Sequence, residues 1–145
     1  MKIRNSAKAI IIHDQKLLVT KLADESGFFY LLPGGGQEAG EKLQDCLVRE
    51  CREETGYEIE VHDLLFVREC FKDEGIHRIE FMFKAELVNL KHKVPFNRDD
   101  AQVGVEWISL ENVLNEPLFP VELRQRIAVA YKEGRQERVY IGEIE

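Results

Sequence analysis

The segment that most constrains this chain is LLPGGGQEAGEKLQDCLVRECREETGYE, residues 31–58. Three consecutive glycines lead into a run of helix-forming residues, and residues 37–60 hold eight acidic and three basic side chains. Residues 37–60 therefore carry a charge of −5, out of a formal net charge of −7 for all 145 residues. Like charges at such density repel one another, so either water screens them or a positive group holds them together.

Residues 42–55 of this segment are predicted to form a helix. On a helical wheel, Leu43 and Leu47 mark the side that faces the protein. Glu50 and Glu54 fall on that same side, one or two turns further along, so a solvated face does not explain them. Glu53 falls beside them, whereas the side opposite the apolar residues holds Asp45, Arg49 and Arg52.

Carboxylates that face a protein body without compensation cost several kcal/mol or must take up protons. A bound divalent cation removes that cost, and ligands with only oxygen donors favour a hard ion such as Mg²⁺ or Mn²⁺. Glu50 and Glu54 lie one turn apart and can converge on such an ion, and Glu53 can complete a cluster that holds two or more. The helix therefore predicts a metal site.

Three other parts of the segment fit this prediction. Glycines 34–36 let the backbone approach a metal or a phosphate closely. Glu41 lies near the start of the helix, where the dipole favours a carboxylate, which predicts a capping role. Arg49 either orients one of the carboxylates or forms a surface ion pair.

The rest of the chain predicts a mixed sheet between helices. Strands are predicted in SAKAIIIHDQKLLVTKL with a turn near Asp14-Gln15, and in GFFYLLP, YEIEVHDLLFVREC, HRIEFMFKAELV and VEWISL, with glycines 34–36 as a loop. In HRIEFMFKAELV, alternation puts Ile79, Phe81, Phe83, Ala85 and Leu87 on one face and Arg78, Glu80, Met82, Lys84 and Glu86 on the other. A brief helix near Glu111 and a closing helix in FPVELRQRIAVAYKEG follow, the latter with a core-facing stripe of Leu123, Ile127 and Tyr131.

The acidic segment resembles the motif of one family. The Nudix box reads G-x5-E-x7-R-E-U-x-E-E-x-G-U, where U is apolar, and residues 35–57 meet every specified polar and glycine position. Cys51 and Tyr57 stand where an aliphatic residue is usual. The flanking sequences LLPGGG and GVEWISLENV are also similar to the surroundings of the box in Nudix domains.

This resemblance implies a fold and a reaction. The expected fold is of the α/β class, a Nudix-type α/β/α sandwich with a mixed β-sheet, in a single domain over residues 1–145. The expected activity is Mg²⁺- or Mn²⁺-dependent hydrolysis of a nucleoside diphosphate linked to another group. Candidate substrates are a nucleotide, an oxidised dNTP or a nucleotide sugar, and the sequence carries none of the markers that distinguish several Nudix subfamilies.

The resemblance also assigns roles to residues. Metal ligands would be Glu50, Glu53, Glu54 and the carbonyl of Gly35. Catalytic residues would be Glu50 as base, Arg49 as its orienting partner, and Glu53; glycines Gly34, Gly35 and Gly36 would approach the substrate, and Glu41 and Gly56 would be structural. Some members use a base outside the box, for which the candidates are Glu74, Asp99 and Asp100.

Charge and composition limit the classes of partner that this chain is expected to bind. A net charge of −7 argues against a binder of duplex nucleic acid, which carries a basic face. No apolar run has membrane-spanning length, and no secretion signal is recognisable, so with three cysteines a reducing cytoplasm is expected. The expected partner is a small nucleotide, and similar proteins are often homodimers.

One alternative function stays open at this point. A Nudix module can bind a nucleotide as a regulator without hydrolysing it. Such modules tend to lose carboxylates of the box, whereas Glu50, Glu53 and Glu54 are all present here. The sequence therefore favours the enzyme.

Overall fold

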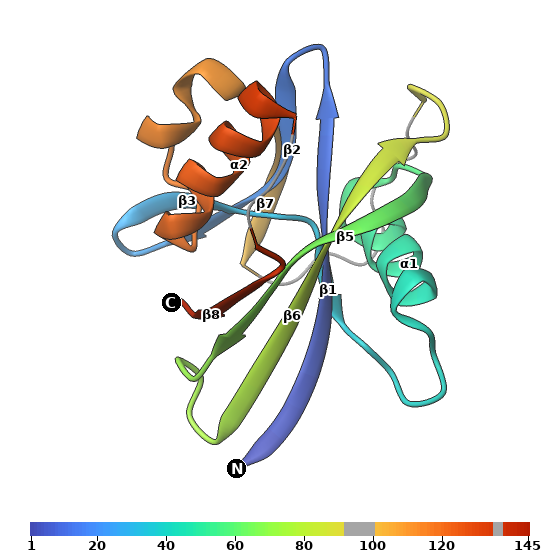
Figure 1. The fold of residues 1–145 in the computed structure, drawn as a ribbon, viewed down its shortest axis with the longest axis vertical. Coiled ribbons are helices and arrows are strands. Elements are labelled where there is room, and N and C mark those ends of the chain that lie inside the picture. Colours follow the sequence, from blue (N-terminus) through green and yellow to red (C-terminus); the bar gives the residue numbers. More distant parts are fainter. Residues whose placement is uncertain (92–100, 135–137) are drawn as a thin grey trace.

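The computed structural model describes residues 1–91, 101–134 and 138–145, and the remaining residues are grey in Figure 1. Its elements, in chain order, are β1 (Lys2–His13), β2 (Lys16–Asp24), β3 (Gly27–Leu31), β4 (Gly34–Gly36), α1 (Leu43–Thr55), β5 (Ile59–Cys70), β6 (Ile76–Leu87), β7 (Gln102–Ser109), the 3₁₀-helix η1 (Leu110–Asn115), α2 (Val121–Glu133) and β8 (Tyr140–Glu143). The helices and the long strands match the predicted segments.

The strands form one mixed sheet with the order β3-β2-β1-β6-β5-β8, in which β4 pairs with β1 and β7 with β2. Strand β1 runs parallel to β6, and β5 runs parallel to β8, whereas the other pairs are antiparallel. The turn predicted near Asp14-Gln15 joins β1 to β2, and both residues have a positive φ, of 50° and 62°. Such angles suit the tight turn of a β-hairpin.

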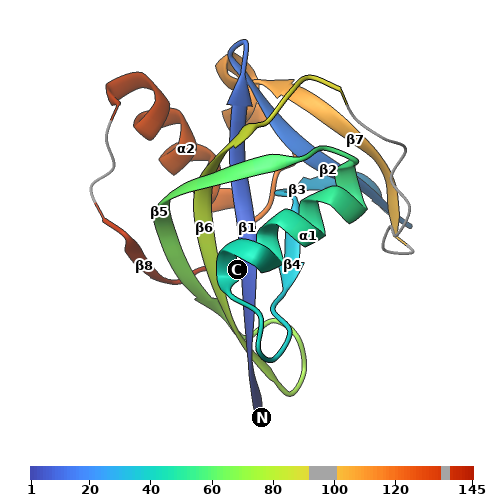
Figure 2. The same ribbon diagram turned by 90° about the vertical axis from the view of Figure 1, so that its right-hand side faces the viewer.

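The two helices cover opposite faces of the sheet (Figure 1), which confirms the predicted α/β sandwich. Strand β1 shows why, because its alternate residues enter two different cores: Ala7, Ala9 and Ile11 pack with α1, and Ile10 packs with α2. Figure 2 shows α1 lying over β4 and β1. Among the described residues, no helix combines the length and the hydropathy needed to cross a membrane.

Glycines 34–36 differ from the prediction, since they form strand β4 rather than a loop. Gly34, Gly35 and Gly36 pair with Lys8, Ala7 and Ser6 of β1. The two backbones approach so closely that a Cβ on Gly34 would lie 2.0 Å from the carbonyl oxygen of Ala7. Only glycine allows this approach, and it fixes the glycine segment on a rigid element.

Strand β6 also differs from a strand with one solvated face. Its predicted alternation is present, but Met82 and Glu80 are buried as well, because the core under α2 covers the second face. Glu80 is compensated by Arg68, whose Nε lies 2.8 Å from Oε1 of Glu80 and whose Nη1 donates to the carbonyl of Ile144. The last strand, β8, was not predicted, and it places Ile144 in the core.

The predicted stripe of the closing helix is correct for two residues of three. Leu123 and Ile127 are buried, but Tyr131 is 44% exposed. The three cysteines are free and buried, in agreement with their interpretation as small apolar residues.

Candidate active site

Helix α1 is anchored to β4 by its buried face. Cys46, Leu47 and Cys51 are fully buried in the core between the helix and the sheet. The thiol of Cys46 donates to the carbonyls of Gly35 and Gly36, at 3.5 and 3.4 Å. Burial raises the pKa of this thiol to about 11, so it stays protonated and keeps its donor at neutral pH. The glycine strand and the helix are thereby held in one register.

Arg49 joins the start of the helix to its functional half. Its Nε and Nη2 donate to the two oxygens of Glu41, at 2.8 and 3.0 Å, and the hydrogen bonds from Arg49 lower the pKa of Glu41 to about 2. Its Nη1 donates to Glu50 at 3.0 Å, and its Nη2 donates to the carbonyl of Gly36 at 3.2 Å. Arg49 thus contacts a carboxylate and does not form a separate surface pair, although the wheel put it on the outer side.

Glu41 also ties the connection before α1 to the helix. One of its oxygens accepts from the backbone N–H of Glu38, and its carbonyl accepts from the side chain of Gln37 at 2.6 Å. The capping role drawn from the residues alone is not what the structure shows, because the residue at the helix N-cap is Lys42. Pairing with Arg49 holds Glu41 instead.

Glu50 and Glu54 reach the glycine strand from α1. A Cβ on Gly35 would lie 2.6 Å from both Cδ and Oε2 of Glu50, so this carboxylate occupies the space that only glycine leaves open. The backbone N–H of Gly34 points at Oε2 of Glu54, at 3.4 Å. The two side chains that the wheel turned inward therefore lie against adjacent residues of β4.

The charges around Arg49 are unbalanced. Its single guanidinium lies within 4 Å of three carboxylates, those of Glu41, Glu50 and Glu53. The side chains of Glu50 and Glu53 are only 18% and 20% exposed, so water screens them poorly. Hard oxygen donors with surplus negative charge fit a divalent cation such as Mg²⁺ or Mn²⁺. Among the described residues, no three His, Cys, Asp or Glu side chains are already arranged around a common point, so the ligand roles stay predictions.

Gly56, Asp45 and Arg52 lie where the helical wheel and the glycine stop signal predict them. Gly56 ends α1 with a positive φ of 77°, and its N–H donates to the carbonyl of Arg52. Asp45 and Arg52 are exposed, and Arg52 pairs with Glu58, so this side of the helix is solvated.

Gln102 is a residue of the site that sequence reasoning missed. It begins β7 and is 7% exposed, and its amide donates to the carbonyl of Glu54 at 3.0 Å and to that of Gly104 at 3.2 Å. The carbonyl of Glu54 is one of the last four of α1, which have no partner within the helix. Gln102 therefore fixes the end of α1 to the sheet, across 48 residues that no local pattern connects.

Within the described residues, the structure places none of the candidate bases from outside the box beside it. Glu74 lies exposed in the turn between β5 and β6. Asp99 and Asp100 lie outside the described residues. On the α2 side, a cavity of about 80 Å³ is lined by Lys8 together with Arg68, Glu80 and Phe119. The ammonium group of Lys8 donates to the carbonyl of Gly34 at 3.4 Å.

Comparison with known proteins identifies the family. The family model described as the NUDIX domain matches residues 2–129, most of the chain. The chain belongs to the Nudix family. A NUDIX hydrolase from Nitrosomonas europaea shares the Nudix fold, with a TM-score of 0.79 at 21% identity over 99% of this chain and 80% of that one. The ORF135 protein of E. coli matches with a TM-score of 0.69 at 25% identity, over 92% and 94% of the two chains.

Two curated relatives are similar to this chain in sequence. Nucleoside diphosphate-linked moiety X motif 6 of Mus musculus is 30% identical over 103 residues, which cover 70% of this chain and 33% of the relative. Nucleoside triphosphatase NudI of Escherichia fergusonii is 42% identical over 59 residues, covering 39% of this chain and 42% of the relative. The matched part of this chain spans only a third to two fifths of the length of these relatives.

Proposed function

We propose that this Nudix domain, taken as one domain over residues 1–145, is a pyrophosphohydrolase that depends on Mg²⁺ or Mn²⁺. The observation that carries the proposal is the contact of Glu50 with Gly35, made while Arg49 holds the same carboxylate. A solvated acidic helix has no reason to bury a glutamate against a glycine strand. The completeness of the box favours the same conclusion over a regulatory module that only binds a nucleotide.

The substrate class that we propose is a nucleoside diphosphate linked to another group. The names of two relatives, nucleoside diphosphate-linked moiety X motif 6 and nucleoside triphosphatase NudI, support it. A nucleotide, an oxidised dNTP and a nucleotide sugar all carry the required phosphoric anhydride. The acidic site predicts that none of them binds well without a divalent cation, because phosphate and carboxylates repel.

The residues of the chain have separate tasks in the proposed reaction. Glu50, Glu53, Glu54 and the Gly35 carbonyl would hold the cation, which when bound neutralises phosphate charge and makes a water more acidic. Arg49 keeps the Glu50 carboxylate oriented through its Nη1 while Glu41 holds the other edge of the guanidinium. Glu50 would accept the proton of the attacking water. The glycines of β4 let the diphosphate approach the backbone without a clash.

Two further properties belong to the same proposal. Three buried free thiols are compatible with a reducing cytoplasm, and a homodimer is expected by resemblance. Sedimentation velocity at several concentrations measures the assembly, and a monomer at all of them would reject the dimer.

The test of the function is a panel of substrates. We expect release of phosphate, pyrophosphate or a nucleoside monophosphate from at least one of dNTPs, oxidised dNTPs, ADP-ribose, nucleotide sugars or dinucleoside polyphosphates with Mg²⁺, and no release with EDTA. Nucleotide binding without turnover of any member, with Mg²⁺ or Mn²⁺ present, would contradict the proposal and favour the regulatory module.

A further inference from the structure

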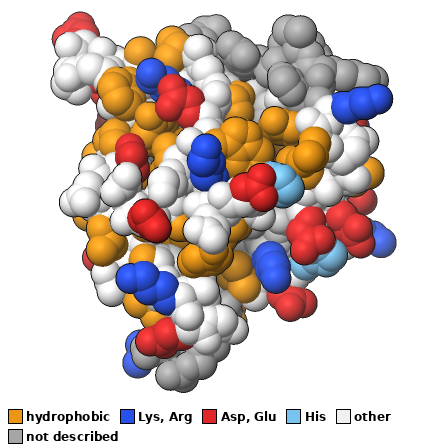
Figure 3. All heavy atoms as spheres, turned by 90° about the horizontal axis from the view of Figure 1, so that it is seen from above, with side chains coloured by type: hydrophobic (Ala, Val, Ile, Leu, Met, Phe, Trp, Pro, Cys, Tyr) orange, Lys and Arg blue, Asp and Glu red, His pale blue; other side chains and the backbone are white. Residues whose placement is uncertain are grey.

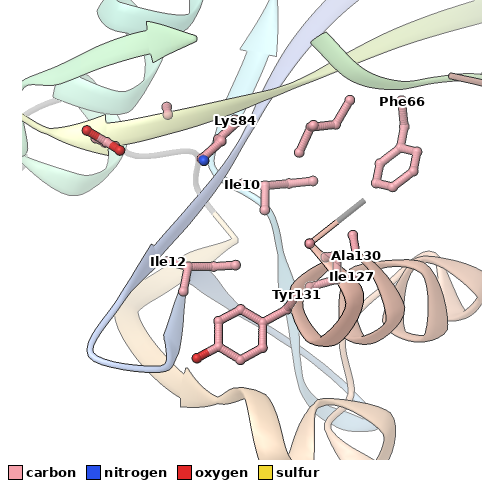
Figure 4. Close-up of a pocket in the computed structure, with 11 residues that line it drawn as sticks. Ile10, Ile12, Phe66, Lys84, Ile127, Ala130 and Tyr131 are labelled. Atoms are coloured by element: carbon pink, nitrogen blue, oxygen red, sulfur yellow. The ribbon is translucent and has the colours of Figure 1, made fainter. Parts of the chain in front are cut away.

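A second concavity lies on the face of the sheet opposite α1, away from the Nudix box. It has a volume of about 400 Å³, within the range of small-molecule sites. Figure 4 shows Ile10 and Ile12 of β1 turned toward Ile127, Ala130 and Tyr131 of α2, with Phe66 of β5 beyond them. None of these residues has a role in the proposed hydrolysis.

The cavity exists because the last turns of α2 do not fill the space above the sheet. Ile127 is buried, but the next residue on this side is Ala130, which is small, and the ring of Tyr131 is 44% exposed. Ile10 and Phe66, which are 4% and 2% exposed, form an apolar floor. Where the β1–β2 hairpin and the end of α2 meet, the surface shows hydrophobic side chains interrupted by charged ones (Figure 3).

Two charged residues of β6 stand at the edge of this cavity, and their surroundings differ. Oε2 of Glu86 lies 3.5 Å from Nε2 of His62 on β5. Lys84 lies directly beside Ile10 in the parallel pair of β1 and β6, and Figure 4 shows its ammonium group next to the apolar wall. Within the part of the chain that the structure describes, no carboxylate lies within 4 Å of this ammonium group.

We infer that this cavity binds an amphipathic monoanion, with an apolar body and one carboxylate, of which a medium-chain fatty acid is the simplest example. The body would lie on Ile10, Phe66 and Ile127, and the carboxylate would pair with Lys84. A long stem lets lysine line an apolar wall while its charge stays at the rim. A nucleotide fits worse, because its several charges would face apolar walls.

The head group is tested first, by titrating the full chain with octanoate, 1-octanol and octyltrimethylammonium in a calorimeter. Octanoate is expected to bind most tightly, at one molecule per chain. Lengthening the acid from hexanoate to octanoate should tighten binding by up to about fifteenfold, because each of the two added methylenes contributes about fourfold when buried. Equal binding of the alcohol, or tighter binding of the ammonium compound, would overturn the assignment of Lys84.

Two variants, with one control variant, locate the site. Lys84→Gln is expected to weaken the binding of octanoate about three- to tenfold and to leave the affinity for 1-octanol unchanged. The control Lys132→Gln, on the exposed last turn of α2, should change neither affinity. Ala130→Phe should abolish binding of both by filling the cavity; if that variant fails to fold, the Lys84 comparison still decides.

Three outcomes contradict the inference. They are no binding of any acid, equal octanoate affinity in Lys84→Gln and wild type, and displacement of octanoate by ADP with Mg²⁺, which would make the cavity part of the nucleotide site. Because binding is measured without turnover, the inference does not depend on the proposed hydrolase activity.

Discussion

The two helices of this domain are alike in form and different in what they face. Each spans 13 residues, lacks a side-chain hydrogen bond at its N-cap and ends at a glycine with positive φ. The second half of α1 turns carboxylates against the glycine strand, where Arg49 holds the carboxylate of Glu50 and Gln102 binds the backbone carbonyl of Glu54. The second half of α2 leaves a cavity instead. Helix formation is therefore decided by local pattern, whereas chemistry is decided by the surface that each helix meets.

The contrast between the two helices is tested most sharply by replacing the glycines under α1 one at a time. Gly35→Ala is expected to lower turnover about 100-fold while the fold persists, because its Cβ meets the movable carboxylate of Glu50. Gly34→Ala should instead destabilise the fold by about 2–4 kcal/mol, since its Cβ meets the backbone of Ala7 and its φ is +137°. Turnover and urea unfolding measure the two effects.

Gly36→Ala is the control for this series. Its Cβ would meet nothing within 4 Å among the described residues, so unchanged stability is expected. Because Gly36 also belongs to the strand proposed to approach the diphosphate, some loss of turnover is expected, but a smaller one than in Gly35→Ala. Loss of activity in Gly36→Ala equal to that in Gly35→Ala would show that the glycines matter only as flexible backbone, and not through the contact with Glu50.

The next largest effect concerns Arg49. Arg49→Lys removes the planar fork that contacts Glu41 and Glu50 together, and we expect turnover to fall about 10- to 100-fold. Arg52→Lys, on the solvated side of the same helix, should leave turnover unchanged. Steady-state kinetics at saturating Mg²⁺ measure both, and an Arg49→Lys variant as active as wild type would remove the orienting role.

Gln102 offers a smaller test of how α1 is held to the sheet. Gln102→Leu keeps the bulk but removes the two donated hydrogen bonds, so we expect a loss of about 1–2 kcal/mol in the free energy of unfolding and a several-fold lower turnover. Gln44→Leu, at an exposed position of α1, is the matched control for urea unfolding. If the two variants behave alike, the bond to Glu54 does not position the helix.

The smallest effect is a dependence on acid just before the start of α1. Hydrogen bonds from Arg49 lower the pKa of Glu41 from 4.5 to about 2. Its stabilising contribution is therefore complete above pH 4.5 and is lost as the pH falls toward 2. Glu41→Gln should be less stable than wild type at neutral pH, and the difference should shrink between these values in acid unfolding curves. Glu38→Gln, which is exposed, should show no such convergence.

Local signals in the sequence predicted much of the fold and part of the site. Periodicity and terminal glycines gave both helices, and the wheel separated the inward Glu50 and Glu54 from the solvated Asp45. Strand β4 was missed because three glycines carry no strand propensity, and only pairing with β1 makes them a strand.

What the sequence could not predict depends on distant contacts. Gln102 lies beside a polar stretch and acquires its role from the end of α1, far away along the chain. Glu80 has the pattern of a solvent-facing residue in an alternating strand until Arg68 and the core under α2 are known. Tyr131 continues the stripe of α2 in period, but a cavity separates the last turns of α2 from the sheet, and the ring is 44% exposed.

The central claim is that the inward carboxylates of α1 act through a divalent cation. The most direct measurement is Mn²⁺ binding by electron paramagnetic resonance, with turnover at saturating Mg²⁺, for wild type, Glu50→Gln, Glu54→Gln and the solvated control Asp45→Asn. We predict that both glutamine variants stay folded, bind Mn²⁺ at least about tenfold more weakly and lose most turnover, while Asp45→Asn matches wild type. Wild-type Mn²⁺ affinity and near wild-type kcat in either glutamine variant would contradict the account.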